Sequence, residues 1–556
     1  MKRFSFLVSV VTACAGFWLL SCDKAPCDMP ATCKKSVDVF SVADLEKELK
    51  SNGTADCLCV RTGMYEKAFT VARPVKIFGE KGKESVLTQT GGVTVTVAAD
   101  EVTLKDLVIR AEAPGSYAVS AEGTETQKKE GLTIDSCQIE ANDNSHGIKA
   151  ANTTGIIIQN GIIIQNGIIE EESIKPIGVH LTDSTDISIT GTEFQNNGGV
   201  HEDKASEFNK SGASGSWSLV VQGGAEKSEI SLKDSSFTDG NKEALLTTAL
   251  RAENSDITVE SAAVSGFTMA YAFIDSTATV KGGTVKDIKA TIAAMYASNT
   301  RLTLQKGTYM AITNVDKNAT IDTSGGGRGL ALVNGSVLSA TGIDVSDCEA
   351  QGILFENSSG TLNDLRINDN SQVGIWIQET ADKKISGKKI VIEDSELEGN
   401  GGAGIFVVAK PEEVEDLSGI EIRNTAISAT KLVQGKSVMA DGLVVRSLSL
   451  HSEELDVVVL DNVTFENNTR TGAIFDGIAS STTPLTGIKT SEVKVKEDTT
   501  GENTENKYGI IIQNGKPPDG FQAGITENPF KQKDLNFMDA GSPLKIGTET
   551  VAIPAL

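Results

Sequence analysis

A short repeated unit constrains this 556-residue chain more than any other feature of its sequence. The heptapeptide Gly-Ile-Ile-Ile-Gln-Asn-Gly occurs three times, beginning at Gly155, Gly161 and Gly509. A looser unit, a glycine followed by apolar residues, begins at Gly147, Gly178, Gly352, Gly374, Gly404, Gly442, Gly472 and Gly509. The starts at Gly352, Gly374 and Gly404 are 22 and 30 residues apart. Repeats of about 20–50 residues indicate a solenoid or a propeller.

The segments between the glycines decide between these architectures. Short stretches such as Leu132–Ile139 and Ile390–Leu397 alternate apolar and polar residues, which is typical of β-strands. Asn, Asp and Gly lie between them and favour turns with left-handed backbone, where stacked Asn side chains can bond along the axis. A seven-bladed propeller is the alternative, but it needs four regularly spaced strands per blade, and the sequence lacks that spacing. We therefore expect an all-β solenoid.

The start of the repeat region carries a recognisable motif. Arg61–Glu66 and Val71–Gly79 are similar to "Gly-x-Tyr-Glu … Lys-Pro-Val-x-Ile-x-Gly", which opens the right-handed parallel β-helix, or pectin-lyase-like, superfamily. The resemblance covers residues 37–515 and implies a right-handed parallel β-helix with inserted loops. Ser41–Asp44 has a capping-box pattern before an apolar helix face, which predicts a short N-terminal capping helix. Residues 516–556 are expected to form a C-terminal tail or cap.

The first residues have the pattern of an export signal. Lys2 and Arg3 precede an uncharged apolar run that ends at Ser21, so residues 1–21 are predicted to be a signal peptide. Leu19-Leu20-Ser21-Cys22 resembles the lipobox of bacterial lipoproteins, which implies lipidation of Cys22 and a tether over residues 22–36. The alternative is an ordinary signal peptide with an incidental cysteine.

Composition limits the partners and the location. The net charge of −24 would repel nucleic acid, so no nucleic-acid partner is expected. Removal of residues 1–21 removes two cations and leaves a net charge of −26. Because an acidic chain is not attracted to an anionic membrane surface, lipid on Cys22 would have to provide the membrane attachment. We expect a bacterial cell-envelope location, favouring the outer membrane or the cell surface. Asp23 resembles an inner-membrane retention signal and keeps that membrane possible.

Six cysteines remain after Cys14 and Cys22 are set aside. Four of them lie close together near the N-terminus, which in an exported protein predicts two disulfides: Cys27, Cys33, Cys57 and Cys59. Their pairing does not follow from the sequence, and a zinc site is the alternative. Cys137 and Cys348 are predicted to be thiols of the core.

The chemistry of enzymes with this fold is not visible in the sequence. His146 partly matches a polygalacturonase motif, but the Asn-Asp-Asn-Ser repeat before it predicts an ordinary turn. Acidic residues with Arg366, for example Glu396 and Glu398, could suit a lyase, yet such acids usually lie on solvated faces. We therefore assign no catalytic residue, no metal ligand and no cofactor.

The glycine-led strands predict one distinctive surface. The middle residue of each apolar trio should point outward, because side chains alternate along a strand. Stacking in register would align five of them in an outer apolar column: Leu354, Trp376, Phe406, Val444 and Ile474. This column would be either a groove for a glycan or a protein strand, or a surface covered by inserted loops or the tail.

Three functional hypotheses follow. The first is a lipid-anchored, non-enzymatic binding or scaffold protein of adhesin type, with a polysaccharide or an envelope protein as partner. The second is a carbohydrate-active enzyme, a polysaccharide lyase or glycoside hydrolase with divergent catalytic residues. The third is a structural spacer.

Overall fold

The computed structural model describes most of the chain after its N-terminal segment. The described residues are 27–551, except 143, 167, 170–175, 197, 202–215, 241–243, 291, 315–325, 380–388, 410–418, 432–439, 447–456, 478–483, 497–507, 514–516, 528–536, 539–543 and 547–548. Residues 1–21, Cys22 and the first part of the expected tether lie outside this set. No described helix has the length and apolar character that crossing a membrane requires.

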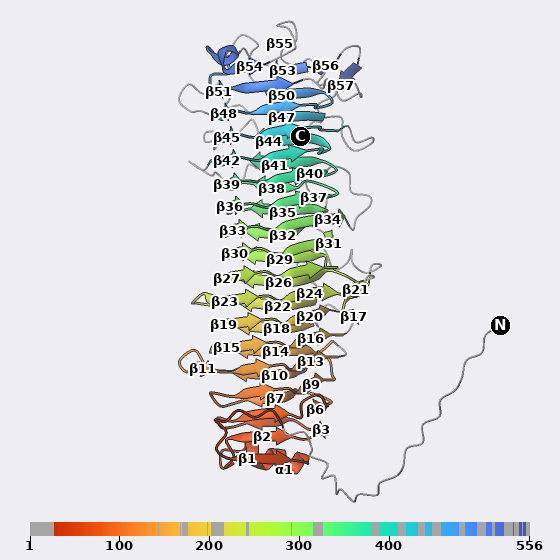
Figure 1. The fold of residues 1–556 in the computed structure, drawn as a ribbon, viewed down its shortest axis with the longest axis vertical. Helices are drawn as coiled ribbons and strands as arrows, with labels where there is room; N and C mark the ends of the chain where they lie inside the picture. The colour runs from red at the N-terminus through yellow and green to blue at the C-terminus, as the bar shows by residue number, and fades with distance from the viewer. Residues whose placement is uncertain are drawn as a thin grey trace, which may run out of the picture.

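The molecule is a column of stacked coils, each made of three short strands (Figure 1). One coil, for example, runs through β12 (Thr133–Asp135), β13 (Gln138–Ala141) and β14 (His146–Ala151). Each strand pairs in parallel with its counterparts in the coils below and above, which creates three long sheets named A, B and C. The fold is a right-handed parallel β-helix, as the repeat and the N-terminal motif predicted.

Sheet C carries the glycine-led strands, and its labels run up the centre of Figure 1. Its strands are β4 (Phe69–Val71), β7 (Val93–Val97), β10 (Tyr117–Glu122), β14 (His146–Ala151), β18 (Ile177–Thr182), β22 (Ser216–Gln222), β26 (Thr247–Glu253), β29 (Met269–Ile274), β32 (Ala293–Ser298), β35 (Arg328–Val333), β38 (Ile353–Glu356), β41 (Val373–Glu379), β44 (Gly402–Ala409), β47 (Ala440–Arg446), β50 (Thr471–Asp476), β53 (Tyr508–Gln513) and β55 (Phe537–Met538). At about 4.8 Å per coil, the stack from β4 to β53 is about 70 Å long.

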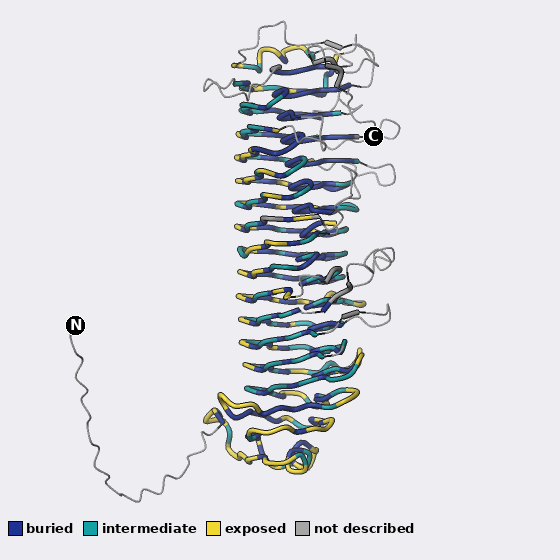
Figure 2. The backbone as a smooth tube through the Cα atoms, turned by 90° about the vertical axis from the view of Figure 1, so that its right-hand side faces the viewer, coloured by how far each residue is buried: buried dark blue, intermediate teal, exposed yellow. Residues whose placement is uncertain are grey.

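The inward side chains of the three sheets form one hydrophobic core that runs along the axis. Figure 2 shows that buried residues recur in coil after coil of the column. In sheet C, Ile353 and Phe355 point into it, and both are fully buried. Alternation along the strand therefore sends the residue between them, Leu354, out of the solenoid.

Close packing of neighbouring coils explains the repeated glycine. A Cβ on Gly374 would lie 2.6 Å from the carbonyl oxygen of Gly404, and one on Gly404 would lie 2.7 Å from that of Gly442. Since real Cβ atoms do not approach backbone oxygens so closely, any larger residue would force the coils apart. The same contact recurs at Gly147, Gly178, Gly352, Gly442 and Gly472.

Asn and Asp occupy the corners between sheets. Many have left-handed backbone, including Asp394 (φ 50°) and Asn424 (φ 45°), which these residue types tolerate best among non-glycine residues. Their side chains also bond along the axis: the Asn370 amide donates to Oδ1 of Asn400 at 2.8 Å. Such stacked turns repeat the same geometry from coil to coil.

A short helix closes the N-terminal end. Helix α1 (Val42–Leu49) begins after Ser41, whose hydroxyl accepts the Asp44 N–H at 3.2 Å, and it buries Leu45 and Leu49 against the first coil. This is the predicted capping helix. Strand β1 (Ser36–Val39) begins at Ser36, which is the last residue of the segment expected to be a tether.

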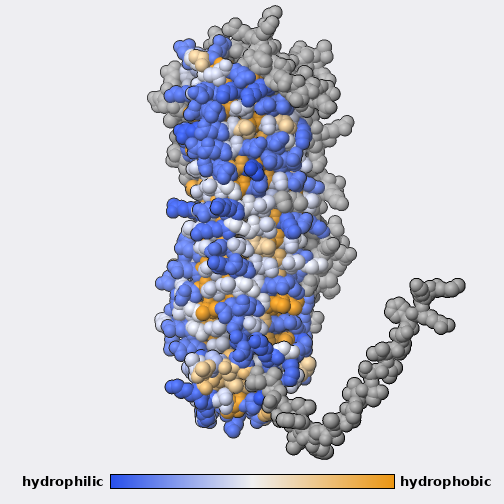
Figure 3. Space-filling view, viewed as in Figure 1, coloured by the Kyte–Doolittle hydropathy of each residue, from blue (hydrophilic) through white to orange (hydrophobic). Residues whose placement is uncertain are grey.

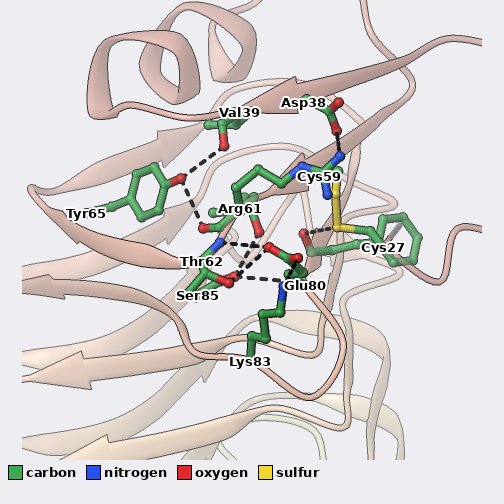
Figure 4. Close-up of polar contacts among 12 residues, drawn as sticks. Cys27, Asp38, Val39, Cys59, Arg61, Thr62, Tyr65, Glu80, Lys83 and Ser85 are labelled. Carbon is green, nitrogen blue, oxygen red and sulfur yellow. Dashed lines mark hydrogen bonds and ion pairs between the residues drawn. A yellow bond between two sulfur atoms is a disulfide. The ribbon is translucent and has the colours of Figure 1, made fainter. Parts of the chain in front are cut away.

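Two disulfides fix the chain before β1. They join Cys27 to Cys59 and Cys33 to Cys57. Cys57 and Cys59 both lie on β2 (Cys57–Val60). Beside them the Arg61 guanidinium pairs with Asp38 at 2.8 Å (Figure 4). The remaining two described cysteines, Cys137 and Cys348, are free and buried in the core, and burial raises the pKa of Cys137 to about 12.

The described part of the C-terminal tail extends the solenoid. Strand β54 (Ile525–Glu527) pairs in parallel with β52 (Val493–Lys496) of sheet B. Phe521, in the 3-10 helix η2 (Phe521–Gly524), is buried against the Phe475 ring, with ring centres 6.0 Å apart. Part of the tail therefore covers the last core layer.

Candidate functional site

The structure places the five residues of the expected apolar column in one line. Each is the direct register partner of the next, on β38, β41, β44, β47 and β50: Leu354, Trp376, Phe406, Val444 and Ile474. Ile511 of β53 continues the line. Trp376 and Phe406 pack edge to face, with ring centres 5.1 Å apart. The column belongs to an apolar cluster that is separate from the core of the solenoid.

This column is not an open surface. The exposed fractions of its five side chains range from 2% to 9%, although they point out of the solenoid. The indole N–H of Trp376 is buried and has no hydrogen-bond partner within the described residues. Burial agrees with the covered alternative rather than with an open groove, and ligand binding through these residues stays a prediction.

A buried ion pair adjoins the upper part of the column. Arg470 holds both carboxylate oxygens of Asp441, with Nε to Oδ1 at 2.7 Å, and the Thr471 hydroxyl donates to Oδ1 at 3.0 Å. Burial raises the pKa of Asp441, and Arg470 opposes that shift. Asp441 is the second residue of β47 and lies two residues before Leu443, so the pair anchors the strand that carries Val444.

Below Leu354, the outward-pointing residues of sheet C are no longer all large and apolar. Following the register down the sheet, the line passes through small or aromatic residues and then reaches Arg251, Val220, His180 and Lys149. Figure 3 shows this face, where apolar patches are interleaved with polar side chains. We call the lower part the aromatic–polar strip, and its nine members are Tyr117, His146, Trp217, Lys149, His180, Arg251, Glu122, Gln222 and Glu253.

Aromatic rings form one edge of the strip. Tyr117 and His146 are register partners on β10 and β14, and their rings stack with centres 4.5 Å apart. Trp217 lies two coils further on, and the guanidinium carbon of Arg251 sits 5.6 Å from the centre of its ring. All four side chains are half-buried, so their faces are partly open to solvent.

Polar groups form the opposite edge and neutralise the cations. Lys149 pairs with Glu122 at 2.9 Å. The Arg251 Nε donates to Glu253 at 2.9 Å, and the Gln222 amide donates to the same carboxylate at 3.1 Å. The strip therefore combines ring faces with many hydrogen-bonding groups and carries no unpaired side-chain charge that would favour an ionic ligand.

His146 directly follows the turn that its sequence context predicted. In that turn the Ser145 N–H donates to the Asn142 carbonyl at 2.9 Å, and His146 then opens β14, where its Nδ1 accepts the Ile177 N–H at 3.2 Å. Burial, followed by the nearby His180 and Lys149, lowers the pKa of His146 to about 4. The ring that stacks on Tyr117 is consequently neutral at pH 7.

The acidic residues considered for lyase chemistry lie elsewhere. Arg366, on β40 (Arg366–Asn368), is the register partner of Glu396, on β43 (Glu396–Glu398), and Glu398 is exposed with them in sheet B. Within the described residues, no three His, Cys, Asp or Glu side chains are grouped so that they could hold a metal ion. These groups are exposed cross-strand neighbours on the outer face of sheet B.

Sequence reasoning missed the strip because its members do not share a motif. Tyr117, His146 and Trp217 follow different local sequences, and only Lys149 and His180 have the glycine-led context that exposed the upper column. The usable signal was positional: Lys149 and His180 each follow a repeat glycine by two residues, as Trp376 and Phe406 do. Extending the alignment downward would have found part of the strip.

The comparisons with known proteins concern the fold. Residues 305–427 match the family model described as "Right handed beta helix region". The chain is similar in structure to the catalytic domain of a GH87 alpha-1,3-glucanase in complex with nigerose, with a TM-score of 0.39, 12% identity, and coverage of 75% of this chain and 67% of that one. No curated protein matches the sequence.

Two further solved structures are similar. Tailspike protein 3 of bacteriophage CBA120 has a TM-score of 0.36 and 10% identity, covering 86% of this chain and 61% of that one. The periplasmic alginate epimerase AlgG has a TM-score of 0.30 and 10% identity, covering 73% of this chain and 78% of that one. At such scores and identities, no function is inferred from these likenesses.

Proposed function

We propose that this chain is a lipid-anchored, non-enzymatic protein of the bacterial cell envelope that binds a neutral glycan along the aromatic–polar strip. The observation that carries the proposal is the Trp217–Arg251 contact beside the Tyr117–His146 stack, in the lower half of sheet C, where these four side chains are half-buried. Half-buried rings offer flat apolar faces to sugar rings, while the adjacent polar side chains offer donors and acceptors to hydroxyl groups.

Charge favours a neutral glycan over an acidic one. Lys149 and Arg251 already pair with carboxylates, so an anionic polymer would have to displace Glu122 or Glu253. The rest of the protein is strongly acidic and would repel that polymer at long range. Anchoring through Cys22 rests on the lipobox-like sequence and would hold the solenoid at the cell envelope.

The same strip is poorly suited to glycoside hydrolysis. Glu122 and Glu253 lie on β10 and β26, four coils apart, which corresponds to about 19 Å along the axis. Paired catalytic carboxylates of glycosidases are about 5–9.5 Å apart. This separation favours binding without cleavage at this surface.

A glycan screen on the soluble chain from Asp23 tests the proposal. Each glycan that binds is incubated with the protein and analysed for shorter products. Binding of neutral glycans with no cleavage supports the proposal, whereas cleavage favours a carbohydrate-active enzyme. The absence of any glycan binding would overturn the glycan assignment and favour a protein partner or a spacer.

A further inference from the structure

Two strongly exposed apolar side chains lie close together at the N-terminal end of the solenoid. Met64 and Phe40 are the most exposed large apolar side chains, at 64% and 58%. Phe40 follows β1, and the guanidinium carbon of Arg61 lies 5.8 Å from its ring centre. Met64 lies on β3 (Gly63–Glu66), three residues after Arg61. We call Phe40, Arg61 and Met64 the basal patch.

Backbone contacts make the patch one local surface. The Arg61 N–H donates to the carbonyl of Val39 at 3.0 Å, and the Tyr65 hydroxyl donates to the same carbonyl at 2.9 Å. These bonds, part of which Figure 4 shows, tie the residues before Phe40 to those on both sides of Met64. Tyr65 points inward, so its neighbour Met64 points outward.

The first disulfide places this end near the proposed lipid. Cys27 is bonded to Cys59 on β2, and the neighbouring Asp28 pairs with Lys81 at 3.2 Å. Cys27 is only five positions after Cys22, with four residues between them. A fully extended chain of that length reaches at most about 18 Å. Without the disulfides, the first fixed position would be β1 at Ser36, and the reach would be about 50 Å.

Charge separates the basal end from the rest of the column. Residues 27–110 contain 12 Lys and Arg and 12 Asp and Glu, whereas residues 111–556 contain 36 and 62. An anionic lipid surface therefore repels the sides of the column but not its base. Because charges are screened beyond about 8–10 Å, an upright column brings only its neutral coils into range, while a column lying flat brings in many acids.

We propose that the basal patch is a membrane-docking surface, which places Phe40 and Met64 in the interfacial layer of the bilayer. This inference rests on the lipid anchor of the proposed function. The short segment between Cys22 and Cys27 keeps the patch near the bilayer, and the aromatic–polar strip lies on coils further up the column. The disulfides thus limit how far the basal patch can lie from the lipid, and they also fix this end of the fold.

The test supplies the anchor chemically, so it does not depend on lipidation in the cell. The chain from Cys22, with both disulfides formed, is coupled to a maleimide phospholipid. Cys22 is the thiol that reacts, because the disulfides block four cysteines and Cys137 and Cys348 are buried. The product is inserted into vesicles of phosphatidylcholine and phosphatidylglycerol whose acyl chains carry bromine, a short-range quencher of tryptophan.

Single tryptophans then report depth. We expect brominated lipid to quench the added fluorescence of Phe40→Trp and Met64→Trp several-fold more than that of Val337→Trp, a control on β36 (Val337–Thr341) in the body of the column that is 37% exposed. Equal quenching at all three positions, or none at Phe40→Trp and Met64→Trp, would overturn the docking surface. Mass spectrometry of Cys22 from bacterial membranes tests the natural lipid separately. An unmodified Cys22 would contradict the proposed lipid anchor but not the proposed docking surface.

Discussion

The guanidinium carbon of Arg251 lies 5.6 Å from the centre of the Trp217 ring, and both side chains stand on the outer face of sheet C. The Arg251 Nε also donates to the Glu253 carboxylate at 2.9 Å. The cation is thereby fixed against the ring while part of the ring stays open. This arrangement provides a preorganised platform, since little side-chain freedom remains to be lost when a ligand binds.

Trp217→Ala is expected to weaken glycan binding by about tenfold, corresponding to the loss of about 1.4 kcal/mol of ring contact. Its melting temperature should change little, because the ring is only half-buried. Titration of a glycan found in the screen measures the affinity. Ile157→Ala removes an exposed apolar side chain from sheet A and serves as the control. Equal affinity of Trp217→Ala and the native chain would argue against the strip.

Trp376→Ala should behave in the opposite way. The ring is buried and contacts Phe406, so its removal leaves a cavity and is expected to lower the free energy of unfolding by about 3–5 kcal/mol. Glycan affinity, measured below the new melting temperature, should be unchanged. Loss of binding at unchanged stability would instead show that the upper column is a ligand site.

Gly374→Ala tests the packing of the coils. The new Cβ would lie 2.6 Å from the Gly404 carbonyl oxygen, which cannot move without displacing the next coil. We expect a loss of about 1–3 kcal/mol in urea unfolding. Gly91→Ala is the matched control, since a Cβ there meets nothing within 4 Å. Similar stabilities for the two variants would contradict the glycine ladder.

Asp441→Asn removes the negative charge that lies against the buried Arg470 guanidinium. Removing one member of a buried pair costs about 3–5 kcal/mol, because the remaining charge stays desolvated. Asp38→Asn removes the carboxylate of a pair that is more open to solvent, where the cost is about 0–1 kcal/mol. Denaturant unfolding of both variants distinguishes the two environments, and a small effect at Asp441 would contradict the assigned pairing.

His146 should give the fold a defined dependence on pH. Its pKa is about 4 in the folded chain against 6.5 for a free histidine, so between these values the unfolded chain binds a proton that the folded chain does not. Stability must therefore fall as the pH drops from 6.5 to 4, by at most about 1.4 kcal/mol per pH unit. His146→Gln should lack this contribution in unfolding curves measured across the range. Identical slopes for the two proteins would exclude it.

Much of the fold could be predicted because each coil repeats one local pattern. The glycines at Gly374 and Gly404, the alternation around Leu354 and the Asn turns are local signals, and stacking multiplies them. Ser41 and Leu45 predicted the capping helix because the capping pattern and the apolar helix face are also local signals. The disulfide pairing could not be predicted, since it depends on how Cys27 and Cys33 approach β2 from outside the repeat.

The candidate site was less accessible to sequence reasoning. The alternation that sends Trp376 outward is local, but its burial depends on what packs over sheet C. Tyr117, His146 and Trp217 lie 29 and 71 residues apart, and only the register of β10, β14, β18 and β22 brings them onto one edge. The sequence by itself determined a parallel β-helix, because short-range periodicity dictates the coil. Which outward side chains are buried, which are open and which become neighbours was decided only by the tertiary structure, because those properties depend on contacts between distant segments.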